Sequence, residues 1–133
     1  MDKVRLLDIK KILDDRGNLS VIESNCDIPF TIKRTYWIYD VPGGEVRGGH
    51  AFKEQKELII ALSGSFDVLL NDGKEETVHS LNRAYFGLHV PNNVWRQMKN
   101  FSTNSVALVL SSTDFSQDDY IYDLNEFLNL KND

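Results

Sequence analysis

The segment that ends the first half of this 133-residue chain constrains its fold more than any other feature. Residues 43–64 read GGEVRGGHAFKEQKELIIALSG. Five residues separate Gly44 from His50, four separate Phe52 from Glu57, and six separate Glu57 from Gly64. Whether this segment holds a metal or carries out metal-free acid and base chemistry depends on His50, Phe52 and Glu57, because these are the residues that could ligate or exchange a proton.

The rest of the chain is a succession of short apolar or alternating segments separated by turn residues. Asn71-Asp72-Gly73 is a hairpin signal between two such segments. In residues 30–39 every second side chain points to the same face, so Arg34 and Tyr36 share a face and Tyr36 is predicted to point inward. Further strands are predicted at residues 4–7, 9–13, 19–23, 58–63, 65–70, 76–81, 84–90, 95–98 and 105–111.

Only the tail has helical periodicity, with Ile121, Leu124, Phe127 and Leu128 on one face of residues 120–130. This pattern predicts a short helix packed outside the strands. Many short strands with Gly, Pro and Asn turns indicate an all-β fold, a jelly-roll β-barrel with a short C-terminal helix. The length fits a single domain over residues 1–133.

The spacing of residues 44–64 resembles the first signature of the cupin superfamily, with Phe52 in place of the second histidine. A second signature would place another histidine near Trp95, where the chain reads Val94-Trp95-Arg96-Gln97. His50 and Glu57 are then the remaining donors, and three or four are needed to hold an ion. We therefore expect no metal and no cofactor.

Composition limits the partners. The net charge is −5 and the pI about 5.1, which disfavours nucleic acid and anionic membranes as partners. The lone Cys26 cannot form an intramolecular disulfide. The N-terminal sequence lacks a signal-peptide pattern and no apolar run is long enough to span a bilayer, so a cytoplasmic location is expected.

His50 is the first candidate for chemistry, because imidazole can take and give a proton near neutrality. A lone histidine can also be a structural core residue. Arg47 lies three residues upstream, where it could neutralise a phosphate, and the intervening glycines allow close backbone approach. The other candidates for binding an anionic ligand, each of which could instead have an ordinary structural role, are Arg16, Arg34, Phe52, Lys53, Trp95 and Arg96.

Segments along nearly the whole chain resemble the sugar 3,4-ketoisomerases that act on dTDP-4-keto-6-deoxyglucose, also known as a WxcM-like C-terminal domain. The matching segments are Asp15-Arg16-Gly17-Asn18-Leu19, Ile28-Pro29-Phe30, Ile32-Lys33-Arg34 with Tyr36, Arg47-Gly48-Gly49-His50-Ala51, Leu62-Ser63-Gly64-Ser65, Val94-Trp95-Arg96-Gln97-Met98 and Asp119-Tyr120-Ile121.

This resemblance implies a homodimer with exchanged N-terminal strands that moves a carbonyl from C4 to C3 of a dTDP-linked sugar, for the biosynthesis of unusual deoxyamino sugars of lipopolysaccharide or other glycans. It also implies that His50 is the proton shuttle and that Tyr36 hydrogen-bonds the sugar oxygens. The family usually has a second histidine where this chain has Phe52. If His50 alone serves one face of the sugar, the product has the galacto configuration.

Two alternatives stay open at the level of sequence. A dTDP-sugar 3- or 3,5-epimerase would share the jelly roll and the Arg-Gly-x-His motif, although no aspartate is obviously placed to partner His50. A non-catalytic cupin that binds a nucleotide-sugar would explain Phe52 as a loss of function.

Overall fold

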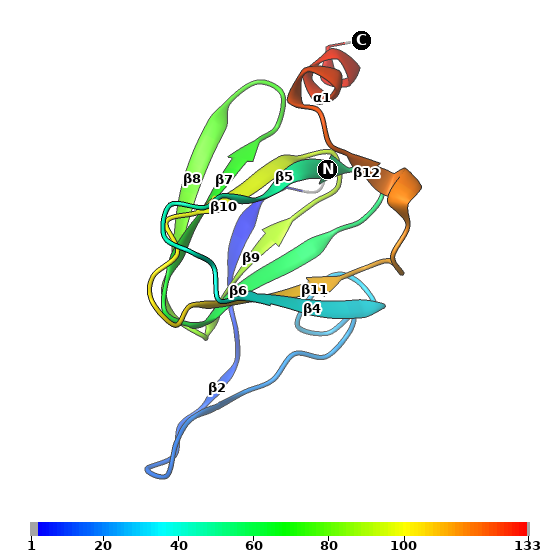
Figure 1. The fold of residues 1–133 in the computed structure, drawn as a ribbon. Coiled ribbons are helices and arrows are strands. Elements are labelled where there is room, and N and C mark those ends of the chain that lie inside the picture. Colours follow the sequence, from blue (N-terminus) through cyan, green and yellow to red (C-terminus); the bar gives the residue numbers. More distant parts are fainter. Residues whose placement is uncertain (1–2, 133) are drawn as a thin grey trace.

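The computed structural model describes residues 3–132, which form two five-stranded sheets that face each other (Figure 1). The first sheet has the order β1-β9-β6-β11-β4 and the second β12-β5-β10-β7-β8, and neighbouring strands in both sheets are antiparallel. The strands are β1 Arg5–Asp8, β2 Lys11–Ile12, β3 Leu19–Ser20, β4 Arg34–Tyr39, β5 Arg47–Phe52, β6 Glu57–Ser63, β7 Phe66–Asn71, β8 Glu76–Leu81, β9 Phe86–Val90, β10 Trp95–Lys99, β11 Val106–Ser111 and β12 Tyr120–Ile121.

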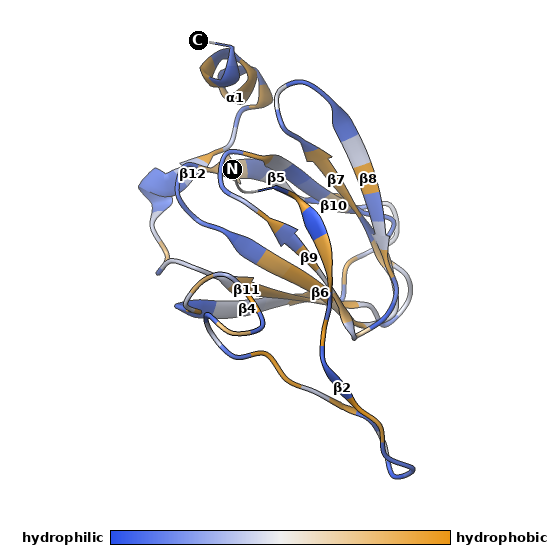
Figure 2. Cartoon of the chain, turned by 180° about the vertical axis from the view of Figure 1, so that it is seen from behind, coloured by the Kyte–Doolittle hydropathy of each residue, from blue (hydrophilic) through white to orange (hydrophobic). Residues whose placement is uncertain are grey.

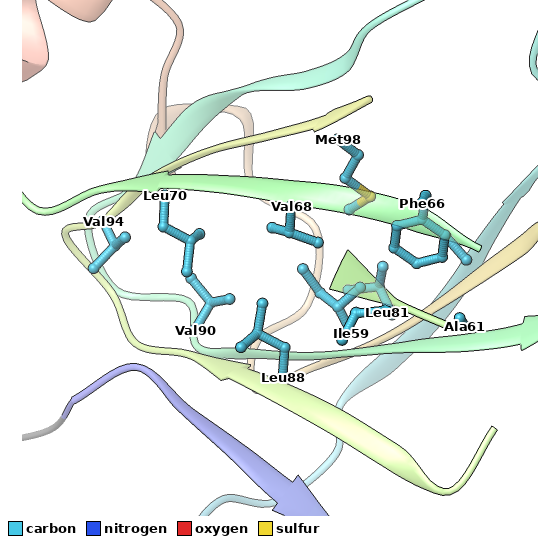
Figure 3. Close-up of a cluster of buried hydrophobic side chains, with 12 residues drawn as sticks. Ile59, Ala61, Phe66, Val68, Leu70, Leu81, Leu88, Val90, Val94 and Met98 are labelled. Carbon is cyan, nitrogen blue, oxygen red and sulfur yellow. The ribbon is translucent and has the colours of Figure 1, made fainter. Parts of the chain in front are cut away.

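Alternate side chains of both sheets fill the space between them. Figure 3 shows Phe66 and Val68 of β7 directed toward Ile59 of β6 and Leu88 of β9. Twelve buried residues form this core, and Ile59, Val68, Leu88 and Val109 are fully buried. Burial of that apolar surface is the main stabilisation of the sandwich.

Each sheet is also covered on its outer face. Residues 22–32 cross the first sheet and place Ile28 and Phe30 against Leu58 and Leu110. Helix α1, Leu124–Lys131, covers the second sheet, where its Phe127 packs against Trp95. Figure 2 shows apolar colouring along β6 and β7 and polar colouring at the tip of the hairpin that contains β2.

The predicted all-β jelly roll with an outer C-terminal helix is confirmed, but several boundaries differ from prediction. The strands predicted at residues 9–13, 19–23 and 84–90 are shorter, as β2 Lys11–Ile12, β3 Leu19–Ser20 and β9 Phe86–Val90. Two further differences follow from packing. β4 begins at Arg34 instead of residue 30, because Phe30 leaves the sheet to cover its outer face. The helix begins at Leu124 instead of residue 120, because Tyr120 pairs with Phe52 as β12 and the Asp123 side chain accepts the first helical N–H groups.

The N-terminal hairpin stands apart from both sheets. β2 and β3 pair only with each other, as predicted for two strands around a turn, and Figure 1 shows them projecting away from the sandwich. Ile12 and Leu19 are 54% exposed and Leu13 is 74% exposed. Within the part of the chain that the structure describes, no helix is long and apolar enough to cross a membrane.

Candidate active site

Polar side chains gather at one end of the space between the sheets. In β6, Glu57 lies on the same face as Ile59, because side chains alternate along a strand. Ser111 of β11 pairs with Glu57 on one side and with Arg34 on the other, which aligns the ends of three strands. The cluster consists of Arg34 and Tyr36 of β4, His50 of β5, Glu57 of β6 and Arg96 of β10.

A buried ion pair lies at the centre of this cluster. Glu57 and Arg96 are each 1% exposed, and Nε of Arg96 donates to Oε1 of Glu57 at 2.5 Å. Nη2 of Arg96 donates to Oε2 of Glu57 at 3.1 Å and to the Tyr36 hydroxyl oxygen at 2.7 Å. The Tyr36 hydroxyl in turn donates to Oε2 of Glu57 at 2.6 Å. The three side chains thus form a closed set of charge-assisted hydrogen bonds.

Gln55 extends this set to Arg34. Its Nε2 donates to Oε2 of Glu57 at 3.0 Å and to Oγ of Ser111 at 3.2 Å. Its Oε1 accepts from Nη2 of Arg34 at 2.8 Å and from the Thr113 hydroxyl at 2.8 Å. Because the Gln55 amide is satisfied on both sides, it fixes Arg34 relative to Glu57.

His50 lies beside the ion pair in an aromatic wall. Its ring centroid is 4.7 Å from that of Phe52, 5.0 Å from Tyr120 and 6.3 Å from Tyr122, all in edge arrangements. Nε2 of His50 is buried and has no hydrogen-bond partner within residues 3–132. A buried imidazole nitrogen without a partner is uncommon and indicates a site for a ligand or a reacting group.

The charges of the cluster set the protonation states. Burial, together with the charges of Arg96 and Arg34, lowers the pKa of His50 to about 3, although Glu57 opposes this change. Burial would raise the pKa of Glu57, but Arg96 outweighs it and holds that pKa below its ordinary value. Burial and Glu57 raise the pKa of Tyr36. At neutral pH the site therefore holds a neutral His50, an ionised Glu57 and a neutral Tyr36.

A bulge in β5 makes room for Arg96. The pairing of β10 with β5 shifts register between Arg96 and Met98, and Gly48 has a φ of +76°. A Cβ atom on Gly48 would collide with Nη1 of Arg96 and would lie 3.8 Å from Cε1 of His50. Glycine at this position thus permits both the left-handed backbone and the close approach of the guanidinium.

The structure brings together some of the predicted site residues. Tyr36, His50, Phe52, Arg34 and Arg96 lie around one point, with the Arg96 guanidinium 5.9 Å from the Phe52 ring centroid and that of Arg34 5.3 Å from the Tyr36 ring centroid. Tyr36 is directed inward, as predicted from the alternation of β4.

Other predicted residues lie elsewhere. Trp95 points to the opposite face of β10 from Arg96 and packs under α1. Arg47 is exposed and lines a cavity of about 410 Å³ with Trp37 and Tyr39. Lys53 is exposed at the end of β5. Arg16 is paired with Asp14 on the turn of the projecting β2–β3 hairpin.

Several residues of the cluster were not predicted from the sequence as site residues. Gln55 lies inside the predicted motif, and only its inward position two residues before Glu57 could have indicated its role. Tyr120 and Tyr122 come from a segment that was predicted to be helical, and no element was predicted around Phe115, so no local signal placed them beside His50 or Arg34.

Glu57 was considered as a metal ligand, but its carboxylate is occupied by Arg96, Tyr36 and Gln55. Among residues 3–132, no group of three or more His, Cys, Asp or Glu side chains is arranged to hold a metal ion. Arg96 occupies the region where the second cupin signature would place a histidine. Its guanidinium supplies the positive charge beside Glu57.

Two facing sheets in jelly-roll order, with an imidazole and two arginines at one end of their interior, define a cupin-type protein. The chain belongs to the FdtA family, described as WxcM-like, C-terminal, whose model matches residues 2–132. The predicted resemblance to this family is confirmed.

Characterised relatives and solved structures agree with this assignment. The TDP-4-oxo-6-deoxy-alpha-D-glucose-3,4-oxoisomerase of Aneurinibacillus thermoaerophilus is 41% identical over 123 residues, covering 92% of this chain and 88% of that protein. A 3,4-ketoisomerase from Helicobacter canadensis has a TM-score of 0.95 and 41% identity, covering 98% of each chain. A sugar 3,4-ketoisomerase from Thermoanaerobacterium thermosaccharolyticum, solved with TDP, has a TM-score of 0.95 and 36% identity, covering 97% of this chain and 94% of that chain.

The epimerase alternative has only distant support. The dTDP-4-dehydrorhamnose 3,5-epimerase of Bacillus anthracis has a TM-score of 0.77 at 17% identity, covering 88% of this chain and 76% of that chain. At this identity the likeness concerns the fold alone.

Proposed function

We propose that this protein is a sugar-nucleotide 3,4-ketoisomerase that converts a TDP-4-keto-6-deoxyhexose into the TDP-3-keto-6-deoxyhexose. The observation that carries the proposal is the neutral His50, whose buried Nε2 has no partner within residues 3–132 and lies beside two arginines. The identity of 41% to an oxoisomerase supports this substrate class. A histidine-to-asparagine variant of the Thermoanaerobacterium relative has been solved with TDP-4-keto-6-deoxyglucose, a sugar nucleotide of the same class.

The reaction needs only the movement of protons. His50 takes the proton from C3, the C–H electron pair becomes the C3–C4 double bond, and the C4 carbonyl pair moves onto O4. O4 then gains a proton and the C3 hydroxyl loses one. The C3 ketone forms as the double-bond pair takes the proton from His50 at C4. Atoms and electrons balance, because one carbon is oxidised and its neighbour reduced within the same molecule.

The environment of His50 suits this cycle. A neutral imidazole can accept the C3 proton at neutral pH, and the positive charges that keep it neutral also favour an enediolate beside it. Phe52, Tyr120 and Tyr122 line the imidazole and reduce access of water to it. His50 is the proposed base, and Arg34 is a proposed substrate contact on the same face of β4 as Tyr36.

We also propose that two chains form a homodimer by exchange of N-terminal strands. The β2–β3 hairpin supports this proposal, because its Leu13 and Leu19 are exposed and belong to none of the three hydrophobic clusters among residues 3–132. Arg16 on its turn would then reach a sugar nucleotide bound to the partner subunit. Sedimentation velocity of Leu13→Asp/Leu19→Asp is expected to give a monomer, and a dimer unchanged by this variant would contradict the exchange.

The function is tested by incubating the protein with the TDP-4-keto-6-deoxy sugar and a 3-aminotransferase, which consumes the 3-keto product. The protein is expected to yield the 3-amino sugar, and His50→Asn is expected to abolish turnover while TDP binding, measured by calorimetry, is kept. His79→Asn is the matched control, because His79 lies on β8 and bonds to Thr77 away from the site.

Binding of TDP without turnover by the unmodified protein would support a non-catalytic receptor instead. Near-normal turnover of His50→Asn would remove this histidine from the mechanism.

A further inference from the structure

The hydrogen bonds around Tyr36 leave it without a proton for the substrate. A phenol has one O–H donor, and that of Tyr36 points to Oε2 of Glu57 at 2.6 Å. Its oxygen also accepts from Nη2 of Arg96 at 2.7 Å. Burial and the neighbouring carboxylate hold the phenol protonated, so it keeps this arrangement at neutral pH. Tyr36 therefore donates to Glu57 and accepts from Arg96 within the cluster. A hydrogen-bond donor to the sugar has to come from another residue.

Arg96 has the donors that Tyr36 lacks. A guanidinium carries five N–H groups, and Glu57 and Tyr36 use the one on Nε and those on Nη2. Nη1 is buried and has no partner in the described part of the chain. Arg96 is 1% exposed, and a charged donor buried without a partner is costly unless a ligand uses it.

The unpartnered Nη1 of Arg96 and the ring of His50 lie close together beside Gly48. A Cβ atom on Gly48 would collide with Nη1 of Arg96 and would lie 3.8 Å from Cε1 of His50, so the two groups border the same short stretch of β5. Nε of Arg34 is likewise buried and without a partner among residues 3–132, and its charge acts on His50. A substrate carbon that gives a proton to His50 would thus have its neighbouring oxygen close to Nη1.

Phe52 keeps Nη1 available. Its ring lies 5.9 Å from the Arg96 guanidinium and 4.7 Å from the His50 ring, so it is packed against both. A phenyl ring offers no lone pair, whereas an imidazole at this position could accept a hydrogen bond from Nη1. The substitution of the usual histidine by Phe52 therefore leaves the donor free for a ligand.

We propose that Nη1 of Arg96 donates the hydrogen bond that stabilises the negative charge on O4 of the enediolate, and that Tyr36 and Glu57 are positioning residues that orient the guanidinium. This inference rests on the proposed function. When His50 takes the C3 proton, the charge that moves onto O4 meets the free N–H groups of Nη1, which are already held in place. Gly48 supports the arrangement because any larger residue would displace Nη1.

The experiment compares Tyr36→Phe with the double variant Glu57→Gln/Arg96→Met, which keeps the buried region neutral. Each protein is tested for thermal unfolding, TDP binding, kcat and KM, and for exchange of the C3 hydrogen of the substrate in D2O. The exchange follows enediolate formation directly. The double variant is expected to bind TDP. Its kcat and its rate of C3-hydrogen exchange are expected to be about 10² to 10³ times lower, as for the loss of one oxyanion donor. Tyr36→Phe is expected to lose less than about tenfold in kcat, because the donor remains.

A loss in Tyr36→Phe as large as in the double variant would overturn the proposal, and so would exchange by the double variant within about tenfold of the unmodified protein. If the double variant does not fold, Gly48→Ala is tested in its place. It is expected to lower kcat at least about tenfold with KM little changed. An unchanged kcat would refute the role of Nη1. Failure of the proposed function is distinguishable, since in that case the unmodified protein itself shows neither exchange nor turnover.

Discussion

Nε of Arg96 lies 2.5 Å from Oε1 of Glu57, and both side chains are almost completely withdrawn from water. Two strands from different sheets, β6 and β10, are joined by this contact at the end of the shared core. Such a pair contributes little net stability compared with apolar residues, but the loss of one partner leaves the other as an isolated buried charge.

Glu57→Gln is therefore expected to destabilise the protein by about 3 to 5 kcal/mol, because the Arg96 charge would lose its counterion in a buried site. Urea unfolding followed by circular dichroism measures this change. Glu54→Gln is the control, since Glu54 is exposed and close in sequence. Equal midpoints for the two variants would contradict the importance of the ion pair.

The lowered pKa of His50 predicts a pH-dependent stability. The folded-state value of about 3 lies below the ordinary value of 6.5, so the unfolded chain binds more protons between these limits. Stability is complete above about pH 6.5 and declines as the pH falls toward 3, by up to about 1.4 kcal/mol per pH unit. The window from about pH 4.5 to 6.5 suits the measurement, because Arg96 holds the pKa of Glu57 below its ordinary value.

Urea unfolding of the unmodified protein, His50→Asn and His79→Asn over this window tests the prediction. His50→Asn is expected to have a flatter dependence, and His79→Asn to keep the original slope. A slope that is the same in all three proteins would show that His50 is not the group responsible.

Gly48→Ala is expected to destabilise the protein by more than about 1 kcal/mol, because the backbone has a positive φ and the new Cβ collides with Arg96. Gly44→Ala is a matched control: Gly44 also has a positive φ, +85°, but no atom lies within 4 Å of its Cβ position. The difference between the two unfolding free energies isolates the collision from the backbone strain. No difference would mean that Arg96 moves aside without cost.

The product is expected to have the galacto configuration at C4. Phe52 cannot exchange a proton and the Tyr36 proton is engaged with Glu57, so the proposed mechanism leaves His50 as the proton carrier on one face of the sugar. A proton returned to C4 from the face on which it left C3 gives an axial C4 hydroxyl. NMR coupling constants of the product distinguish the two epimers, and a gluco product would require a second proton donor.

The alternation of side chains and the turn residues were sufficient to predict much of the fold. Alternation in β4 placed Arg34 and Tyr36 on one inward face, and the Asn71-Asp72-Gly73 turn located the β7–β8 hairpin. The predicted element boundaries were wrong where tertiary contacts determine the local structure. Phe30 lies in a strand pattern and Tyr120 in a helix pattern, but the packing of each residue overrides that pattern.

The site was predictable only where its residues fall in one motif. His50 and Glu57 are close in sequence, but the partner of Glu57 is Arg96, which lies 39 positions away and reaches Glu57 from the facing sheet. Hydrogen-bond direction at Tyr36 depends on that contact, so a sequence pattern could suggest a tyrosine in the site but not the use of its proton. Arg47 and Trp95 are close in sequence to site residues but lie outside the site. Strand alternation directs Trp95 to the opposite face of β10 from Arg96, and Arg47 lies beyond the bulge in β5.

The two-residue strand β12 has a consequence for truncated forms of the protein. Tyr120 pairs with Phe52 and its ring lies beside His50, so the wall around this histidine depends on a segment distant from it in the sequence. Loss of Tyr120 and the residues after it would remove that wall, together with Phe127, which packs against Trp95, and would leave the imidazole open to water.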